Sequence, residues 1–292
     1  MATIPAGFTQ APAVLYYAAD GTGPYTIDTA GRAVLLTSPA EYLTQVAFGL
    51  VPGVTRVAAL GNNPVVDGAT LPEDIWPGGG VYPWMTGATA LQARSTSAQD
   101  AAAGTGASGV TISFLDTAYV PLAPAVVALN GLTPVAINAP TAFRINAARL
   151  STKGSGAPAF GATNAGDIII EDVAGPNTVR GIMPAGKGGL RQSIYTVPAG
   201  FTLQILSQAW GFADVSGGNK YAQFSNYAQA PTGLFSSALT VAVGDEPPYD
   251  QPGLPGIALS EKFDFCYRAT AASAGTHSLF ASWLAILRQN TP

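Results

Sequence analysis

Glycine and proline divide this chain into short segments, and this spacing constrains its fold more than any other feature. The 292 residues include 34 glycines and 23 prolines. Because glycine weakens a helix and proline interrupts one, such frequent breaks leave little room for long helices. The segments between the breaks are short, and many alternate between apolar and polar residues. They predict strands.

The segment Lys262–Arg268 (KFDFCYR) shows this alternation most clearly. Phe263, Phe265 and Tyr267 fall on one face of an extended chain, which predicts a half-buried strand. Comparable runs occur at Val110–Leu115, Ala142–Leu150, Asp167–Glu171, Thr178–Met183, Thr202–Phe212 and Ser278–Leu287. The sequence therefore predicts an all-β fold, an antiparallel β-sandwich of jelly-roll-like type.

The N-terminal part differs from the rest in composition. Residues 1–85 are rich in proline and glycine and contain few alternating runs, so we expect an extended, loop-rich arm that docks onto a partner. Residues 86–292 are expected to hold the β-sandwich domain or domains. One short helix is predicted at Pro39–Phe48, with Ser38 as its N-cap. A long, stiff loop is predicted at Gly244–Gly256, which holds four prolines.

Charged residues are scarce. They make up 10% of the chain, against about 25% in ordinary globular domains. A surface this poor in charge suits a subunit held permanently against neighbours, because burying charges in an interface is costly. A single protein with a neutral polar coat is the alternative. The net charge is −4, and the 13 lysines and arginines are scattered, which argues against nucleic-acid binding.

Other features limit the compartment and the chemistry. No apolar run approaches the roughly 18 residues of a membrane span, so we expect no membrane insertion. The start of the sequence does not resemble a signal peptide. Cys266 is the only cysteine, which excludes an internal disulfide and a thiolate metal cage. These features predict synthesis in a reducing cytoplasm, and the sequence indicates no cofactor.

Two features of the sequence are candidates for ligand binding or catalysis. The segment Gly104–Gly109 (GTGASG) matches a dinucleotide-binding pattern, but a strand follows it where that mechanism requires a helix. It is better interpreted as a turn. His277 is the only histidine, and no serine lies in a nucleophile elbow. We interpret His277 as a turn or surface residue and expect neither a catalytic triad nor a zinc site.

Paired carboxylates remain as candidates for hydrolysis of a glycoside. The sequence offers three neighbouring pairs: Glu73 with Asp74, Glu171 with Asp172, and Asp245 with Glu246. Adjacent acids on a strand point to opposite faces, which is poor geometry for flanking one bond. We interpret them as solvated loop acids and predict no catalytic residues. Calcium binding between Asp245 and Asp250 is an alternative without a recognised motif.

Aromatic residues are the remaining candidates for a site. The segment Leu71–Trp84 (LPEDIWPGGGVYPW) places Trp76, Tyr82 and Trp84 among glycines and prolines, and Tyr249 lies in the proline-rich loop. Large rings on a stiff segment make good interface anchors, because they lose little entropy on binding. The same rings can instead hold the segment against its own domain. The sequence leaves both interpretations open.

Several of these segments, taken in order, resemble a structural protein family of tailed-bacteriophage particles. They are the EDIW, GGG and Tyr motif of residues 73–82, the AAGTGA of residues 102–107, the strand ending at Asp116, the TNAGDIIIE of residues 163–171, and the TVPAG of residues 196–200. The resemblance covers roughly residues 62–205. It rests on the order of several segments.

This resemblance implies a virion structural protein without catalytic residues. We expect a tail or tail-fibre component, assembled in the host cytoplasm, that forms a symmetric homo-oligomer such as a trimer and docks onto other virion proteins. A capsid decoration protein is a close alternative. A receptor-binding or glycan-binding module is another, with a host surface glycan as its partner, and it predicts that Trp76, Trp84, Trp210 or the proline-rich loop around Tyr249 is exposed. An enzyme that cleaves host polysaccharide is a third.

Overall fold

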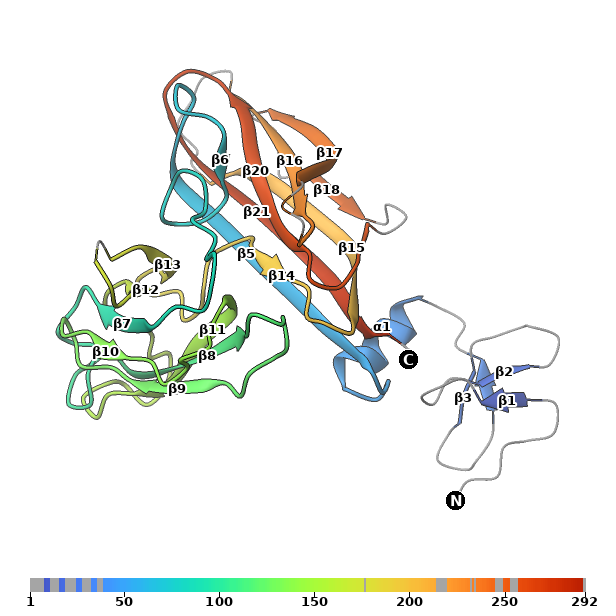
Figure 1. Ribbon diagram of the computed structural model, residues 1–292, viewed down its shortest axis with the longest axis horizontal. Coiled ribbons are helices and arrows are strands. Elements are labelled where there is room, and N and C mark those ends of the chain that lie inside the picture. Colours follow the sequence, from blue (N-terminus) through green and yellow to red (C-terminus); the bar gives the residue numbers. More distant parts are fainter. Residues whose placement is uncertain are drawn as a thin grey trace.

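The computed structural model describes most of the chain, and Figure 1 shows its arrangement. The described residues are 8–10, 16–18, 25–27, 33–35, 39–175, 177–213, 220–231, 233, 235–244, 249–252 and 257–290. They form strands β1 to β21 and the helix α1 (Pro39–Ala47). All named strand pairs are antiparallel, which confirms the predicted all-β, antiparallel fold.

Two β-sandwiches make up most of the described structure. The larger, here called the long sandwich, packs the sheet β18-β15-β21-β5 against the sheet β14-β20-β16-β17, with β19 and β6 added at the side. Its strands are β5 (Val54–Asp67), β6 (Glu73–Asp74), β14 (Tyr195–Thr196), β15 (Phe201–Phe212), β16 (Tyr221–Gln229), β17 (Phe235–Gly244), β18 (Tyr249–Pro252), β19 (Ala258–Leu259), β20 (Asp264–Ala272) and β21 (Thr276–Gln289).

The smaller unit, here called the short sandwich, packs the sheet β10-β7-β12-β13 against the sheet β11-β8-β9. It lies between β6 and β14 in the sequence, so it is an insertion into the long sandwich (Figure 1). Its strands are β7 (Leu91–Ser95), β8 (Ala107–Leu115), β9 (Ala125–Ala128), β10 (Val135–Ala136), β11 (Arg144–Lys153), β12 (Ile168–Asp172) and β13 (Val179–Met183).

Alternating apolar residues build the core of the long sandwich. Trp210, Phe224 and Tyr267 are almost completely buried between the two sheets. The predicted strand at Lys262–Arg268 is confirmed from Asp264 onward, with Phe265 on the core face. It is not half-buried as predicted, because its polar face is also covered. The covering groups come from Leu71–Trp84 and from the short sandwich, which are distant in sequence.

The predicted arm does not extend to residue 85. Strand β5 pairs along its whole length with β21, and β6 pairs with β20, so residues 54–74 belong to the long sandwich. The short strands β1 (Phe8–Gln10), β2 (Tyr16–Ala18), β3 (Tyr25–Ile27) and β4 (Ala33–Leu35) form a separate sheet in chain order. The sequence did not predict the strand β5, because many of its residues are polar or small and give no clear apolar alternation.

The helix prediction is confirmed: α1 begins at Pro39, as predicted, and ends one residue before the predicted end. Its Val46 packs with Val51 against Ile286 of β21. The predicted cap Ser38 lies outside the described residues. The predicted loop at Gly244–Gly256 contains a strand, because β18 pairs with β15 between Ser207 and Trp210. Gly244 ends β17, and residues 245–248 and 253–256, which include Asp245 and Glu246, lie outside the described residues.

Candidate functional site: a cleft between the two sandwiches

The glycine-rich segment Leu71–Trp84 lies at the junction of the two sandwiches. Trp76 and Tyr82 are each 4% exposed and pack together with Cys266 of the long sandwich. The Tyr82 hydroxyl donates a hydrogen bond to the Arg180 carbonyl of the short sandwich, at 2.7 Å. Burial raises the pKa of Tyr82 well above its usual range. The rings therefore hold this segment within the chain, and Trp76 and Tyr82 offer little surface to a partner.

Each of the three glycines in this segment has its own structural reason. A Cβ atom on Gly78 would lie 2.2 Å from the Trp76 ring, so only glycine leaves room for the indole. Gly79 and Gly80 have φ angles of 69° and 62°, a backbone region that side chains disfavour. The Gly80 amide donates to the Glu73 carboxylate at 2.9 Å. The segment is a connector, and its glycines serve its own turn.

The other aromatic candidates are placed differently. Trp84 is half-buried in the same cluster, and its ring centroid lies 5.2 Å from the Arg144 guanidinium. Tyr249 is the first residue of β18 and pairs with Trp210 through the backbone, while its side chain lies outside the described part of the chain. Trp210 itself is 1% exposed. The structure therefore brings Trp76, Tyr82 and Trp84 together and places Tyr249 elsewhere.

Four of the acids predicted to be solvated, Glu73, Asp74, Glu171 and Asp172, are buried instead, while Asp245 and Glu246 lie outside the described residues. Asp74 forms a two-point ion pair with Arg268, at 2.6 and 3.1 Å, and Asp172 forms one with Arg180, at 2.9 and 2.6 Å. Glu171 binds Arg94 in the same way. The sequence did not predict this because every one of these pairings is between residues that are not neighbours in the chain. With their oxygens bound to arginine, these acids are poor candidates for catalysis.

His277 was also placed wrongly by the sequence analysis. It lies within β21 and is 5% exposed, where its Nε2 atom is 3.0 Å from both the hydroxyl and the carbonyl oxygen of Ser273. In the residues that the structure describes, no group of three or more histidine, cysteine or acidic side chains is arranged to hold a metal ion. No described helix is long and apolar enough to cross a membrane.

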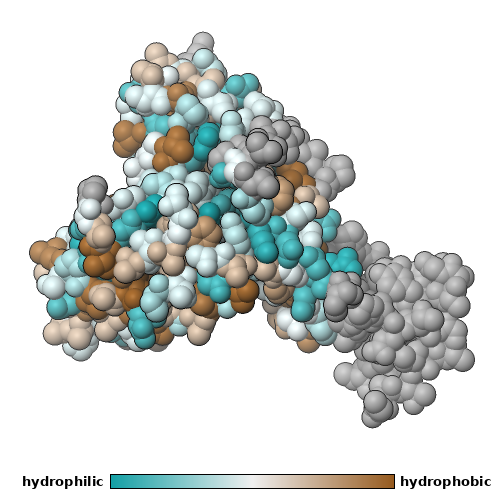
Figure 2. Space-filling model, in the orientation of Figure 1, coloured by the Kyte–Doolittle hydropathy of each residue, from teal (hydrophilic) through white to brown (hydrophobic). Residues whose placement is uncertain are grey.

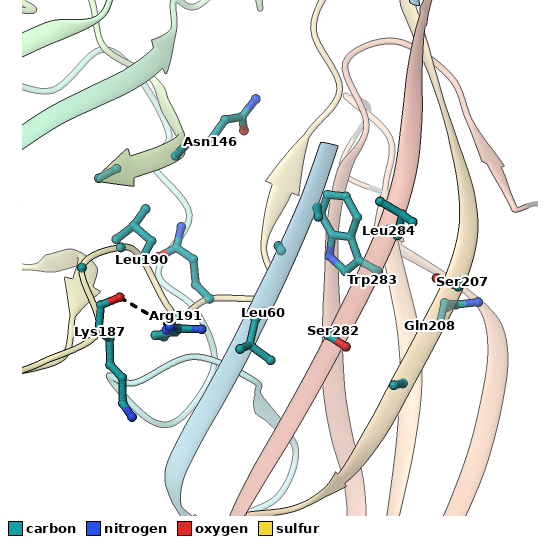
Figure 3. A pocket seen from close by; sticks show the side chains of 18 residues that line it. Leu60, Asn146, Lys187, Leu190, Arg191, Ser207, Gln208, Ser282, Trp283 and Leu284 are labelled. Carbon is teal, nitrogen blue, oxygen red and sulfur yellow. Dashed lines mark hydrogen bonds between the residues drawn. The ribbon is translucent and has the colours of Figure 1, made fainter. Parts of the chain in front are cut away.

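A cleft with a volume of about 720 Å³ lies between the two sandwiches. One wall is the outer face of the long sandwich, where β5, β21 and β15 contribute mostly small residues. The other wall combines β11 with residues 187–192, which connect the short sandwich back to the long one. In Figure 3, Leu60, Ser282 and Leu284 lie on strands of the long sandwich at one side of this space, and Leu190 and Lys187 lie at the other side.

Basic and amide groups dominate the polar lining of this cleft. Lys187 is exposed, and the Arg191 guanidinium donates to the Lys187 carbonyl at 3.4 Å (Figure 3). The Nε atom of Arg191 is buried without a partner among the described residues. The same holds for both side-chain amide atoms of Gln192, a residue that is only 3% exposed. No carboxylate belongs to the lining that the structure describes.

Sequence reasoning missed this site entirely. Its residues come from five separate stretches, and none of those stretches contains a motif. The segment Met183–Gly189 contains the only local signal, a lysine between glycines on a turn. The cleft exists because the short sandwich is inserted into the long one, which is a property of the tertiary structure.

No known protein family matches the chain, and no curated protein is significantly similar to it. Among solved structures, the chain is similar to that of infectious bursal disease virus Gx strain, at 12% identity and a TM-score of 0.24, covering 82% of this chain and 74% of that one. The VP2 subviral particle of the same virus gives 12% identity, a TM-score of 0.18, and coverage of 82% and 77%. TM-scores this low do not establish a shared fold, so nothing is transferred from these particles.

Proposed function

We propose that this chain is a non-enzymatic structural subunit of a tailed-bacteriophage particle, in the tail or a tail fibre. It forms a symmetric homo-oligomer and docks onto other virion proteins. The proposal rests on how the chain uses its few charges, together with the order of sequence segments described above.

Most of the acidic groups that the structure describes are turned inward. Among the described acidic side chains, only Glu261 is exposed. The buried ones are Glu73, Asp74, Asp100, Glu171, Asp172 and Asp264. The surface is left to neutral side chains and to exposed apolar ones such as Phe160 and Val126. Figure 2 shows apolar residues among weakly polar ones over the short sandwich. Such a surface favours lasting contact with neighbouring subunits.

The interior is built for rigidity. Arg144 of the short sandwich binds Asp264 of the long sandwich through two hydrogen bonds, at 2.9 and 2.7 Å. The Asp100 carboxylate accepts backbone hydrogen bonds from Ala107, Ala165 and Gly166. Charges bound in this way are unavailable for acid or base chemistry. The Arg144–Asp264 pair joins the two sandwiches, and Asp100 ties together segments of the short sandwich. A fixed shape of this kind suits a particle component.

The alternative of a glycan-binding module loses its main support. That alternative predicts exposed tryptophan rings or an exposed loop around Tyr249, and of the tryptophans Trp76 and Trp210 are 4% and 1% exposed and Trp84 is half-buried. A capsid decoration protein shares every feature used here, so copy number has to separate it from a tail protein.

The test is to locate the chain in purified particles. Quantitative mass spectrometry and a cryo-electron microscopy map should find it as a particle component. Tail copies are expected in threes, sixes or twelves, whereas hundreds of copies would assign it to the capsid. Light scattering of the purified protein should give the mass of a symmetric oligomer. Absence from particles, together with a monomeric mass, would refute the proposal.

A further inference from the structure

The cleft between the two sandwiches has binding groups that the chain itself does not use. We propose that it receives an extended, acidic polypeptide segment of a neighbouring subunit, laid along the free edge of β5. This inference rests on the proposed function, because it assigns the kind of partner that such a subunit contacts.

The first observation behind this proposal is the distribution of charge on the surface. Although the net charge is −4, the basic residues that the structure shows as exposed are Arg56, Arg149, Lys153, Lys187 and Arg288, against the single exposed acid Glu261. One of them, Lys187, lines the cleft, and others lie near it. Lys187 and Arg191 line it, and Arg149 lies two residues beyond Ala147 on the same face of β11. A ligand that enters this space meets positive charge from several sides and is favoured if it is acidic.

Arg56 extends this positive region along β5. It lies on the same face of the strand as Ala58 and Leu60 and lines an adjoining hollow of about 340 Å³. Leu284 lines both this hollow and the cleft, so the two lie next to each other. The basic residues therefore follow the length of β5, which suits an extended ligand better than a compact one.

Gln192 supplies the second, independent observation. Its side-chain amide is buried at 3% exposure, lines the cleft, and has neither its donor nor its acceptor satisfied in the described structure. Leaving such a group without a partner costs about 1–3 kcal/mol. A peptide bond offers one N–H donor and one C=O acceptor and can satisfy both atoms of this amide.

The third observation is the free edge of the sheet at β5. β5 is the last strand of its sheet, and its residues 55–60 make no backbone hydrogen bond to a described strand on the outer side. Only farther along does the Asn62 amide donate to the Arg191 carbonyl, at the end of the cleft. An exposed strand edge is a template for a further strand, which pairs through its main chain.

The lining favours a polypeptide over an acidic saccharide. Small residues such as Ala58 and Ala147 leave room for a polypeptide beside the edge of β5, and Leu60 and Leu190 offer apolar contact. Trp283 is the only aromatic residue of the lining, and at 3% exposure it presents no ring surface on which a sugar could stack.

The test measures binding of defined peptides to the whole purified chain. The probe is a fluorescent, end-blocked decapeptide of alternating glutamate and threonine, and its control replaces each glutamate by glutamine. Fluorescence anisotropy should show at least tenfold tighter binding of the acidic peptide, and its affinity should fall as salt is raised. Equal binding of both peptides would overturn the charge argument, and absence of binding would overturn the proposal.

Variants locate the binding. Lys187→Gln with Arg191→Gln should weaken the acidic peptide at least tenfold, and Gln192→Leu should weaken it by a smaller factor. Lys153→Gln is the matched control, because Lys153 is an exposed cation that lines a different hollow beside Phe160. Equal losses in the control and the cleft variants would contradict the assignment. In the unmodified chain, hydrogen exchange should slow for residues 55–60 when the peptide binds, which tests the site even if a variant fails to fold.

Two further outcomes separate this inference from the proposed function. If the chain is found in particles but the cleft ignores acidic peptides, the cleft assignment alone is wrong. If the peptide binds as expected and the chain is absent from particles, the proposed function is wrong and the cleft assignment holds. Binding of polygalacturonate in place of the peptide would replace the polypeptide by an acidic saccharide and refute the choice of partner.

Discussion

Arg144 and Asp264, which are 120 residues apart in the sequence, form a buried two-point ion pair that joins the short sandwich to the long one. Two further donors of Arg144 are used, since its Nη1 atom donates to the carbonyls of Met85 and Phe143, at 2.7 and 3.0 Å. The guanidinium lies 3.7 Å from the centroid of the Phe143 ring. Asp264 in turn accepts the Thr196 hydroxyl at 2.6 Å. Arg144 is therefore one of the residues that fix the position of the short sandwich on the long one.

Replacing Arg144 by methionine should destabilise the chain by about 3–5 kcal/mol, because the Asp264 carboxylate then stays buried without its partner. Urea denaturation followed by tryptophan fluorescence measures this loss. The double variant Arg144→Met with Asp264→Leu should recover much of the stability, since no lone charge is left. A loss below about 1 kcal/mol in the single variant would show that water reaches Asp264.

Gly78→Ala should destabilise the chain by about 1–3 kcal/mol, because the added methyl group would lie 2.2 Å from the Trp76 ring. Gly87→Ala is the matched control, since a Cβ atom there meets nothing within 4 Å. Thermal unfolding of the two variants beside the unmodified chain makes the comparison. Similar melting temperatures for both variants would mean that the indole moves aside without cost.

Glu73 should make the stability of the chain depend on pH in the acid range. Burial acts to raise its pKa, but hydrogen bonds from the amides of Gly80 and Asp67 and from the side chains of Asn63 and Thr70 outweigh it and hold the pKa below the ordinary 4.5. Its stabilising contribution is therefore complete above the unfolded pKa and is lost as the pH falls through the lower, folded value.

The variant Glu73→Gln lacks the titrating carboxyl group, so comparing it with the unmodified chain measures the contribution of Glu73 to the pH dependence of stability. The difference in unfolding free energy between the unmodified chain and the variant should be largest near pH 7 and shrink below pH 4.5. Urea titrations between about pH 7 and pH 3 would reveal it. A difference that stays constant over this range would contradict the lowered pKa of Glu73.

Cys266 should be unreactive while the chain is folded. It is completely buried, and burial together with the neighbouring Asp74 carboxylate raises the pKa of its thiol well above the ordinary value of 9.0. Because the thiolate is the reactive form, a disulfide reagent such as Ellman's should label the native chain very slowly. The denatured chain should react at once. Since the chain has one cysteine, rapid labelling of the native protein would directly contradict the burial of Cys266.

The sequence by itself determined the local structure of this protein. Alternation at Lys262–Arg268 specified a strand and the face on which Phe265 and Tyr267 lie, because side chains of a strand alternate between its two sides. Pro39 and the residues after it specified a short helix for an equally local reason. Frequent glycine and proline excluded the long helices of other fold classes.

Only the tertiary structure decided what covers each face and where a site forms. Asp74 is buried because Arg268 reaches it from 194 residues away, and residues 54–67 form a strand because β21 pairs with them. The cleft beside Gln192 arises where the inserted short sandwich meets the outer face of the long one. Partners so distant in the chain leave no trace in local composition, because their contacts depend on how the sheets pack and not on the spacing of residues along the sequence.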